Sequence, residues 1–466
     1  MRKLKLNSLK NTACLLVLVF FVGVVEAPIV DFSKTVYAND AQVASVDEKI
    51  KAFTYQNKGD PFDNNYPATF DTRSKGVVID VSNQGNSNLC WSFAIVSAVE
   101  VGYMLKTGKE IDLSEKHFAY ALSSKISKNG FNRDINAAGS FKMGLAYLTR
   151  WEGPVLQIDD PYTGDFEDRT EMSNSRDSSL RVQGFQNVST SYSSVKKAIL
   201  EYGSAVSNIY VPDNFSDRLN NSVYNTKTYG YYNPDSANIY NHAVLIIGWD
   251  NDFPASNFSN EPPINGAWIV KNSWGDTTGD KGYIYVSYAD ANILKVVNSI
   301  TGIEKVDNQG KIYLYDPFGE TASVHFNKPE AWFANIFTVD NFEEEISEVS
   351  FYLPTSGAKY EIYIGDSLSD RKLVAKGICE GEGYYSVKLD KPISLKTSTC
   401  VVSVKLTKEG GIARIPIESN IMGYVQNATA QLGQSYISSN GKKWIDMVEK
   451  KENTNVCVRI ITKKSA

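Results

Sequence analysis

The stretch that decides the fold runs over residues 83–94 and reads Asn-Gln-Gly-Asn-Ser-Asn-Leu-Cys-Trp-Ser-Phe-Ala. It places Cys90 at the start of an apolar segment, six residues after Gln84. A thiol is a strong nucleophile only as the thiolate, and the positive end of a helix lowers the pKa of a thiol there. The peptide N–H of Cys90 and the side-chain amide of Gln84 can together stabilise a developing oxyanion. The stretch therefore predicts a nucleophilic cysteine, whose general base must lie further along the chain.

The composition is that of a mildly acidic globular protein. The chain has 466 residues, which is enough for two or three domains with a sizeable core. Its formal net charge is −5, and removal of a basic N-terminal segment would make it more acidic. This charge argues against a nucleic-acid partner.

Residues 1–38 have the pattern of a secretory signal. A basic region at 2–10 precedes an apolar stretch at 13–25, and residues 36–38 (Val-Tyr-Ala) supply a small-residue cleavage pattern. The alternative is an uncleaved membrane anchor, but the apolar stretch is too short to span a bilayer comfortably. We therefore expect a protein that is secreted or held at the cell surface, of the Gram-positive bacterial kind, with no transmembrane span after cleavage.

The cysteines are too few for a disulfide-based fold. Cys14 leaves with the signal, and an exported chain with only four remaining cysteines is not a disulfide scaffold. Cys90 is the only one in the first half of the mature chain, so we expect its thiol to be free. The others are expected to be buried thiols, with one disulfide among them left open: Cys379, Cys400 and Cys457.

After the signal, the chain divides into three parts that differ in their pattern of apolar and polar residues. Residues 39–62 are polar and are interpreted as a short pro-segment or linker. Residues 63–297 are rich first in helical and then in strand patterns, which indicates an α+β domain. Residues 298–466 consist of short alternating runs separated by turn signals, which predicts an all-β sandwich of the jelly-roll type.

Local signals place the main elements of the α+β part. A helix is expected from Cys90 to about residue 105, ended by Gly108, and another after an N-cap at Ser114. The continuous apolar run at 243–248 is typical of a buried strand, and a further strand is expected at 268–272.

One histidine stands at the right place to be the base. Of three histidines, His117 lies in a predicted helix and His325 in the β part, where packing or surface roles are the better interpretation. His242 precedes a buried strand about 150 residues after Cys90, the order expected of a cysteine–histidine pair. It can accept the thiol proton and return it to a leaving amine. The Asn272 amide oxygen can then accept from its other ring nitrogen and fix the tautomer.

Each of these residues alone has a structural explanation, since a lone cysteine at a helix start is more often buried than catalytic. Their combination is much harder to obtain by chance. The stretch from Pro67 to Tyr283 resembles the papain family of cysteine peptidases, over about half the chain. The resemblance implies a helical and a β-rich lobe with Cys90 and His242 facing each other across a cleft.

The resemblance also implies roles for particular residues. The catalytic set would be Gln84 in the oxyanion hole, Cys90 as nucleophile, His242 as base and Asn272 as its orienting amide. The substrate side would include Gly139, whose backbone pairs with the substrate, Tyr240 and Ala243 beside the main side-chain pocket, and Trp274 over the His–Asn hydrogen bond. No metal and no cofactor are required by this chemistry.

Three departures from the family pattern are visible. The usual Cys-Gly-Ser before the nucleophile is replaced by Ser87-Asn88-Leu89, so the usual nearby disulfide is missing. An extra loop is expected at residues 250–265, and the pro-segment lacks the long helical inhibitor of plant and lysosomal relatives. None of these changes removes a predicted catalytic residue.

The second part resembles the C-terminal lectin-like domain of a clostridial group of secreted or surface papain-like peptidases. The matching segments are residues 334–337, 348–352 and 433–438. Binding of a cell-surface glycan or protein by this part is implied by that resemblance. Trp332, Tyr352 and Trp444 could stack on sugars, although core packing is the better interpretation, and a structural calcium ion has no ligand-spaced run to identify it.

Three functions are compatible with these features. The first is an active secreted endopeptidase that acts on protein or peptide substrates. The second is a surface-binding, lectin-like protein with a non-proteolytic scaffold, and the third is an amidase or amide-transfer enzyme with the same Cys-His-Asn chemistry. The presence of Gln84, Cys90, His242 and Asn272 together favours the first, because a scaffold has no chemical need for all four.

Overall fold

The computed structural model describes residues 29–31, 58–77, 80–164, 180–212, 222–235, 237, 239–305, 310–339, 344–395 and 397–464. The predicted signal peptide therefore lies outside the described residues except for β1 (Ile29–Asp31), and the predicted pro-segment is described only from residue 58. In the part of the chain that is described, no helix is long and apolar enough to cross a membrane.

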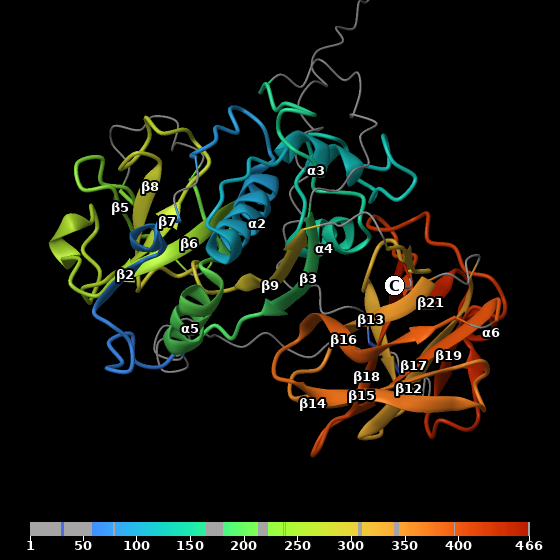
Figure 1. The fold of residues 1–466 in the computed structure, drawn as a ribbon. Coiled ribbons are helices and arrows are strands. Elements are labelled where there is room, and N and C mark those ends of the chain that lie inside the picture. The colour runs from blue at the N-terminus through green and yellow to red at the C-terminus, as the bar shows by residue number, and fades with distance from the viewer. Residues whose placement is uncertain are drawn as a thin grey trace, which may run out of the picture.

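A long buried helix, α2 (Cys90–Thr107), forms the centre of the first half of the molecule (Figure 1). It begins at Cys90 and ends before Gly108, whose φ of 67° lets its N–H donate to the Met104 carbonyl. Both ends agree with the prediction. The predicted cap at Ser114 is also confirmed, since its side chain accepts from the His117 N–H at the start of the next helix. The other helices of this half are η1 (Thr72–Lys75), α3 (Glu115–Ala121), α4 (Phe141–Thr149), α5 (Tyr192–Tyr202) and η3 (Ala255–Asn257).

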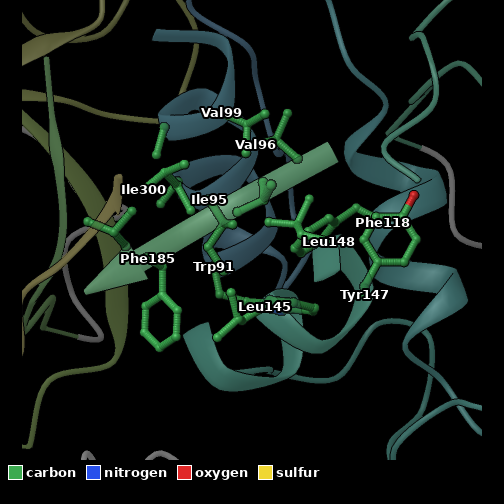
Figure 2. Close-up of a cluster of buried hydrophobic side chains, with 14 of the residues drawn as sticks. Trp91, Ile95, Val96, Val99, Phe118, Leu145, Tyr147, Leu148, Phe185 and Ile300 are labelled. Atoms are coloured by element: carbon green, nitrogen blue, oxygen red, sulfur yellow. The ribbon is translucent and has the colours of Figure 1, made fainter. Parts of the chain in front are cut away.

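The core of this half forms where α2 meets its neighbouring helices and strands. Figure 2 shows apolar side chains from α2, α3, α4 and two strands interlocked in one buried cluster, which includes Trp91, Ile95, Val99, Phe118, Leu145, Phe185 and Ile300. Because this cluster includes Leu89, Cys90 and Trp91, it fixes the N-terminal end of α2 and with it the backbone of Cys90.

A single large sheet runs through the molecule. Its strand order is β10-β22-β13-β16-β3-β9-β4-β6-β7-β8-β5, with β2 paired to β6. The members from the first half are β2 (Thr69–Asp71), β3 (Leu180–Asn187), β4 (Ala205–Ile209), β5 (Gly230–Tyr231), β6 (His242–Asp250), β7 (Ala267–Lys271), β8 (Tyr283–Ser287) and β9 (Asn298–Lys305). Those from the second half are β10 (Ile312–Tyr313), β13 (Glu344–Leu353), β16 (Gly383–Ser394) and β22 (Val458–Lys464).

Two further sheets complete the second half. A six-stranded sheet has the order β15 (Arg371–Cys379), β14 (Ala358–Gly365), β17 (Thr399–Thr407), β12 (Glu330–Thr338), β19 (Ser435–Ser438) and β20 (Ile445–Asp446). A four-stranded sheet has the order β1, β11 (Ala322–His325), β18 (Arg414–Ser419) and β21 (Thr454–Val456), and one short helix, α6 (Met447–Lys450), follows β20. All three sheets contribute to one hydrophobic core, as in a sandwich; examples are Phe333, Val349, Ile362 and Ile417.

The predicted α+β half followed by an all-β half is therefore confirmed. The predicted division at residue 297 cuts just before β9, and this strand pairs with β3 along its length and also with β4 at Asn298. By its pairing, β9 belongs to the first half. The sequence pattern could not show to which half β9 belongs, because a strand with alternating apolar and polar residues looks the same on either side of a domain boundary.

The two halves are joined by more than the chain itself. Strand β16 pairs with β3 at Tyr384 and Phe185, which makes the large sheet continuous between them. Beside this pairing, the fully buried Arg459 forms an ion pair with Asp316 at 2.9 Å and donates from Nη1 to the Thr149 carbonyl at 2.8 Å. A buried guanidinium that loses one of these partners is left uncompensated, so the arrangement fixes the halves relative to each other.

Candidate active site

The Cys90 thiol lies buried at the first residue of α2. Burial raises the pKa of this thiol, because the thiolate is poorly solvated there. Hydrogen bonds from the backbone N–H groups of Ala243, Trp91 and Cys90 itself act in the opposite direction and favour the thiolate. The helix N-terminus supplies N–H donors to the thiol, and Ala243 adds a donor from the neighbouring strand β6. The sequence predicted a lowered pKa for Cys90, but burial outweighs these donors and the pKa is raised.

His242 and Asn272 are brought together by the pairing of β6 with β7. His242 is the first residue of β6, Asn272 follows the last residue of β7, and the ring Nε2 of His242 lies 2.8 Å from Asn272 Oδ1. The same Oδ1 accepts from the Ser273 N–H at 2.8 Å, which identifies it as the oxygen of the amide. Since an amide oxygen can only accept, Nε2 of His242 carries the proton and Nδ1 is the free base.

The surroundings keep the His242 imidazole neutral. Burial lowers its pKa to about 4, and the hydrogen bond to Asn272 acts in the opposite direction. The Trp274 ring stacks on the imidazole with centroids 4.8 Å apart, so it covers one face of the ring. The predicted position of Trp274 over the His–Asn pair is thus present in the structure.

Both the oxygen and the nitrogen of the Gln84 side-chain amide are hydrogen-bonded. Its Oε1 accepts from the Ser273 hydroxyl at 2.6 Å, and its Nε2 donates to the Ser87 carbonyl at 2.7 Å. An amide nitrogen has two hydrogens, so one remains for another acceptor. Its backbone N–H also donates to the Ser273 carbonyl at 2.8 Å. Ser273 was missed in the sequence analysis, although its place between Asn272 and Trp274 was a usable signal.

Two of the residues predicted to contact the substrate, Gly139 and Tyr240, can be described from their surroundings. A side chain at Gly139 would place its Cβ 2.4 Å from the Trp91 ring, so the Gly139 backbone lies directly against the residue after the nucleophile. The Asn88 N–H donates to Asn136 Oδ1 at 3.0 Å, which ties the loop of Gly139 to the segment before Cys90. Tyr240 is buried, and its hydroxyl has no hydrogen-bond partner among the described residues.

A group of buried titratable side chains lies next to the site in sequence and was not predicted. Lys271, directly before Asn272, donates to the Ser97 hydroxyl at 2.9 Å and interacts with the carboxyl groups of Glu100 and Glu115. Burial raises the pKa of Glu100 to about 8 and that of Glu115 to about 7. These contacts join α2 and α3 to β7, and thus join the element of Cys90 to the strand that precedes Asn272.

The remaining predictions on cysteine, histidine and metal sites can be placed as well. Cys379, Cys400 and Cys457 are buried free thiols, as the preferred interpretation had it. His117 is buried with Nδ1 2.7 Å from the Tyr147 hydroxyl, and His325 lies on β11, so neither is in the site. Among the described residues, no group of three or more His, Cys, Asp or Glu side chains could hold a metal ion. A structural calcium ion in the β half, which no sequence run identifies, stays untested.

Comparison with known proteins covers both halves. The family model for papain family cysteine protease matches residues 66–302, and the model for a lectin like domain matches residues 312–462. Cathepsin S of Bos taurus is 28% identical over 244 residues, which are 52% of this chain and 66% of that protein. Vignain of Vigna mungo is 29% identical over 218 residues, 47% of this chain and 53% of that protein. The chain thus spans about half to two thirds of the length of these curated relatives.

The solved structures add the arrangement of the two halves. The cysteine protease and lectin-like domains of Cwp84, a surface layer associated protein of Clostridium difficile, superpose with a TM-score of 0.78 at 27% identity. The match covers 86% of this chain and 89% of that chain. A second structure, of a Cwp84 variant after propeptide cleavage, gives a TM-score of 0.77 at 27% identity over 85% of this chain and 99% of that chain. The fold is therefore a papain-like α+β half followed by a lectin-like β-sheet half.

Proposed function

Since the chain belongs to the papain family of cysteine proteases, we propose that it is a cysteine endopeptidase, exported to act on extracellular or cell-surface proteins. The observation that carries the proposal is the meeting of α2 and β6 at one thiol. Cys90 lies at the start of α2, the Ala243 N–H of β6 donates to it, and His242 directly before Ala243 is oriented by Asn272. A binding scaffold has no need for this arrangement.

Apart from the substrate and a water molecule, the proposed reaction uses only side chains and peptide groups of this chain. His242 takes the Cys90 proton on Nδ1, and the sulfur attacks the substrate carbonyl carbon. The carbonyl oxygen becomes an oxyanion that accepts hydrogen bonds from the Cys90 N–H and the free Nε2 hydrogen of Gln84. The imidazolium gives its proton to the leaving amine, and a thioester remains on Cys90. Water, deprotonated by His242, attacks the thioester and releases the acid and the thiol.

Asn272, Trp274 and Ser273 support this sequence of steps. Asn272 keeps the His242 proton on Nε2, so that Nδ1 is the nitrogen that exchanges protons with sulfur. Trp274 shields the imidazole from water, where its hydrogen bond to Asn272 would weaken. The Ser273 hydroxyl holds the Gln84 amide so that one of the two Nε2 hydrogens remains to donate. On the substrate side, the Gly139 backbone would pair with the peptide, and Tyr240 and Ala243 would border its main side-chain pocket.

The place of action is proposed by analogy with the solved relative. Cwp84 is described as a surface layer associated protein, and it shares both halves with this chain. We place this chain likewise outside the cell or on its surface, where the lectin-like half would contact a surface glycan or protein. The natural substrate of the relative does not transfer with the fold.

The test is hydrolysis of a mixture of unstructured peptides by the purified chain under reducing conditions, followed by mass spectrometry. We expect cleavage that Cys90→Ala abolishes, with a fall in kcat of at least about 10³-fold, since the nucleophile has no substitute. The matched control is Cys379→Ala, which removes another buried thiol and should cleave as the wild type does. Equal turnover by Cys90→Ala would exclude Cys90 as the nucleophile.

A further inference from the structure

One loop of the first half borders the nucleophile on the helical side. We call residues 131–140, between α3 and α4, the cleft loop. Its Asn136 accepts from the Asn88 N–H, and its Gly139 lies against the Trp91 ring. The Arg133 guanidinium lies 4.9 Å from the centre of that ring and donates to four carbonyls along or beside the loop, those of Ala119, Ile135, Ala137 and Ala138. The conformation of the cleft loop therefore sets one wall beside Cys90.

A turn from the lectin-like half holds the start of the cleft loop and reaches its end. We call residues 420–428, which follow β18, the supporting turn. At the start of the cleft loop, the Asn132 N–H donates to the Tyr424 carbonyl at 2.9 Å, and the rings of Phe131 and Tyr424 lie 5.1 Å apart. At its end, burial raises the pKa of the Tyr424 hydroxyl to about 12, while the Ser140 side chain interacts with that hydroxyl and acts to lower its pKa. Figure 1 shows loops of the orange and red half next to the segments around α3 and α4.

The supporting turn is itself firmly built. Ile421 and Val425 exchange two backbone hydrogen bonds, of 2.8 and 2.9 Å. The Asn420 amide closes the base of the turn, accepting from the Ala428 N–H at 2.9 Å and donating to the Ala428 carbonyl at 3.2 Å. Val425 and Ala428 are buried in the hydrophobic core of the first half, although they belong in sequence to the second. A rigid turn that packs into the catalytic half can fix the position of the loop that it contacts.

We infer that Tyr424 is a positioning residue for peptide binding, and that the lectin-like half completes the substrate cleft by fixing the cleft loop. This inference rests on the proposed function, because it assigns Tyr424 to the same cleft. The ligand class is an extended peptide whose backbone lies along Gly139. A small thiol reagent needs only Cys90 and His242, so the two kinds of ligand should respond differently to a change at Tyr424.

Tyr424→Phe tests the inference, because it removes the hydroxyl that interacts with Ser140 and keeps the ring on Phe131. The readouts are the inactivation of Cys90 by a peptidyl epoxide and its alkylation by iodoacetamide, each followed by mass spectrometry. We expect the epoxide concentration for half-maximal inactivation rate to rise about threefold to tenfold, as for the loss of one hydrogen bond. The rate of alkylation by iodoacetamide should stay within about twofold of the wild type, as should kcat for a peptide substrate, because neither depends on the interaction with Ser140.

Tyr352→Phe is the matched control. The Tyr352 hydroxyl is bonded to Thr149 Oγ1 at 2.9 Å, so this variant removes a hydrogen bond across the same junction without touching the cleft loop. It should behave as the wild type toward both reagents. The inference is overturned if Tyr424→Phe matches Tyr352→Phe, or if it slows both reagents equally. Failure of the proposed function has a different signature: the wild type would then hydrolyse no peptide, whatever Tyr424→Phe does to the epoxide.

Discussion

Cys90 and Cys457 are both buried thiols whose pKa is raised by burial, yet their surroundings differ in charge. Backbone N–H groups face Cys90 and oppose the rise in its pKa. Around Cys457, between β21 and β22, the carboxyl groups of Asp316, Glu418 and Glu320 raise its pKa further, and only Arg459 opposes them. Burial alone therefore does not make a nucleophile. A thiol reacts when fixed dipoles stabilise its anion and a base can take its proton.

The two regions also differ in what their polar contacts do. The Arg459–Asp316 pair beside Cys457 satisfies its own charges, and Arg459 also donates to the Thr149 carbonyl of the first half. Near Cys90, by contrast, His242 keeps a basic nitrogen and Gln84 keeps a donor that no described residue uses. Polar groups with an unused donor or acceptor mark a site where a bound ligand can supply the missing partner. The predictions below test this contrast, from the largest effect to the smallest.

The largest effect is expected from Gln84→Ala. Loss of one oxyanion donor lowers kcat by about 10²–10³-fold, because the donor acts on charge that develops only in the transition state. The measurement is steady-state hydrolysis of a peptide substrate. The control is Gln186→Ala on β3, whose amide donates to the Tyr385 hydroxyl and should not affect turnover. If both variants turned over alike, Gln84 would have no part in the oxyanion hole.

A smaller loss is expected from Asn272→Ala. Without the Oδ1 acceptor, His242 is free to rotate and to change tautomer. We expect kcat to fall at least about tenfold, but by less than the ~10²–10⁴-fold that the general base itself supplies. KM should change little, since Asn272 does not face the peptide. A rise in KM at constant kcat would instead place Asn272 in substrate binding.

The acid limb of the pH profile tests the environment of His242. Burial holds the pKa of His242 near 4, below its ordinary value of 6.5. The neutral imidazole, which acts as the base, is therefore present above about pH 4 and becomes protonated as the pH falls through about 4. We therefore expect kcat/KM to fall about tenfold between pH 6 and pH 3. An uncharged substrate and a check of the far-UV spectrum at each pH are needed. A limb at about pH 6.5, the ordinary value for histidine, would mean that the imidazole is open to water.

The sequence predicted the parts of the site that rest on local signals. Cys90 and the helix it starts, Ser114 as a cap, and the strand after His242 all follow from residues within one or two turns of the chain. The 2.8 Å contact of His242 and Asn272 was foreseen, as a pairing, from the combination of residue types. Their roles as base and orienting amide remain predictions until activity is measured.

What the sequence did not predict depends on pairings between distant segments. The assignment of β9 to β3, the continuity of the large sheet through β16, and the contact of Tyr424 with Ser140 each join residues more than a hundred positions apart. A strand pattern specifies which face is buried and leaves the partner strand open. Tyr424 in particular lies in a short turn without a motif, so no local signal could have connected it with the cleft.

The measurement that tests the account most directly is labelling of the thiols with a papain-family epoxide inhibitor, read by intact and peptide mass. Four of the five cysteines lie in the described part of the chain. The account predicts one adduct, on Cys90, that disappears in His242→Ala, while Cys379, Cys400 and Cys457 stay unlabelled in the folded protein. Labelling of Cys457 at a similar rate, or undiminished labelling of Cys90 in His242→Ala, would contradict it, because reactivity would then follow access alone rather than the groups that surround Cys90.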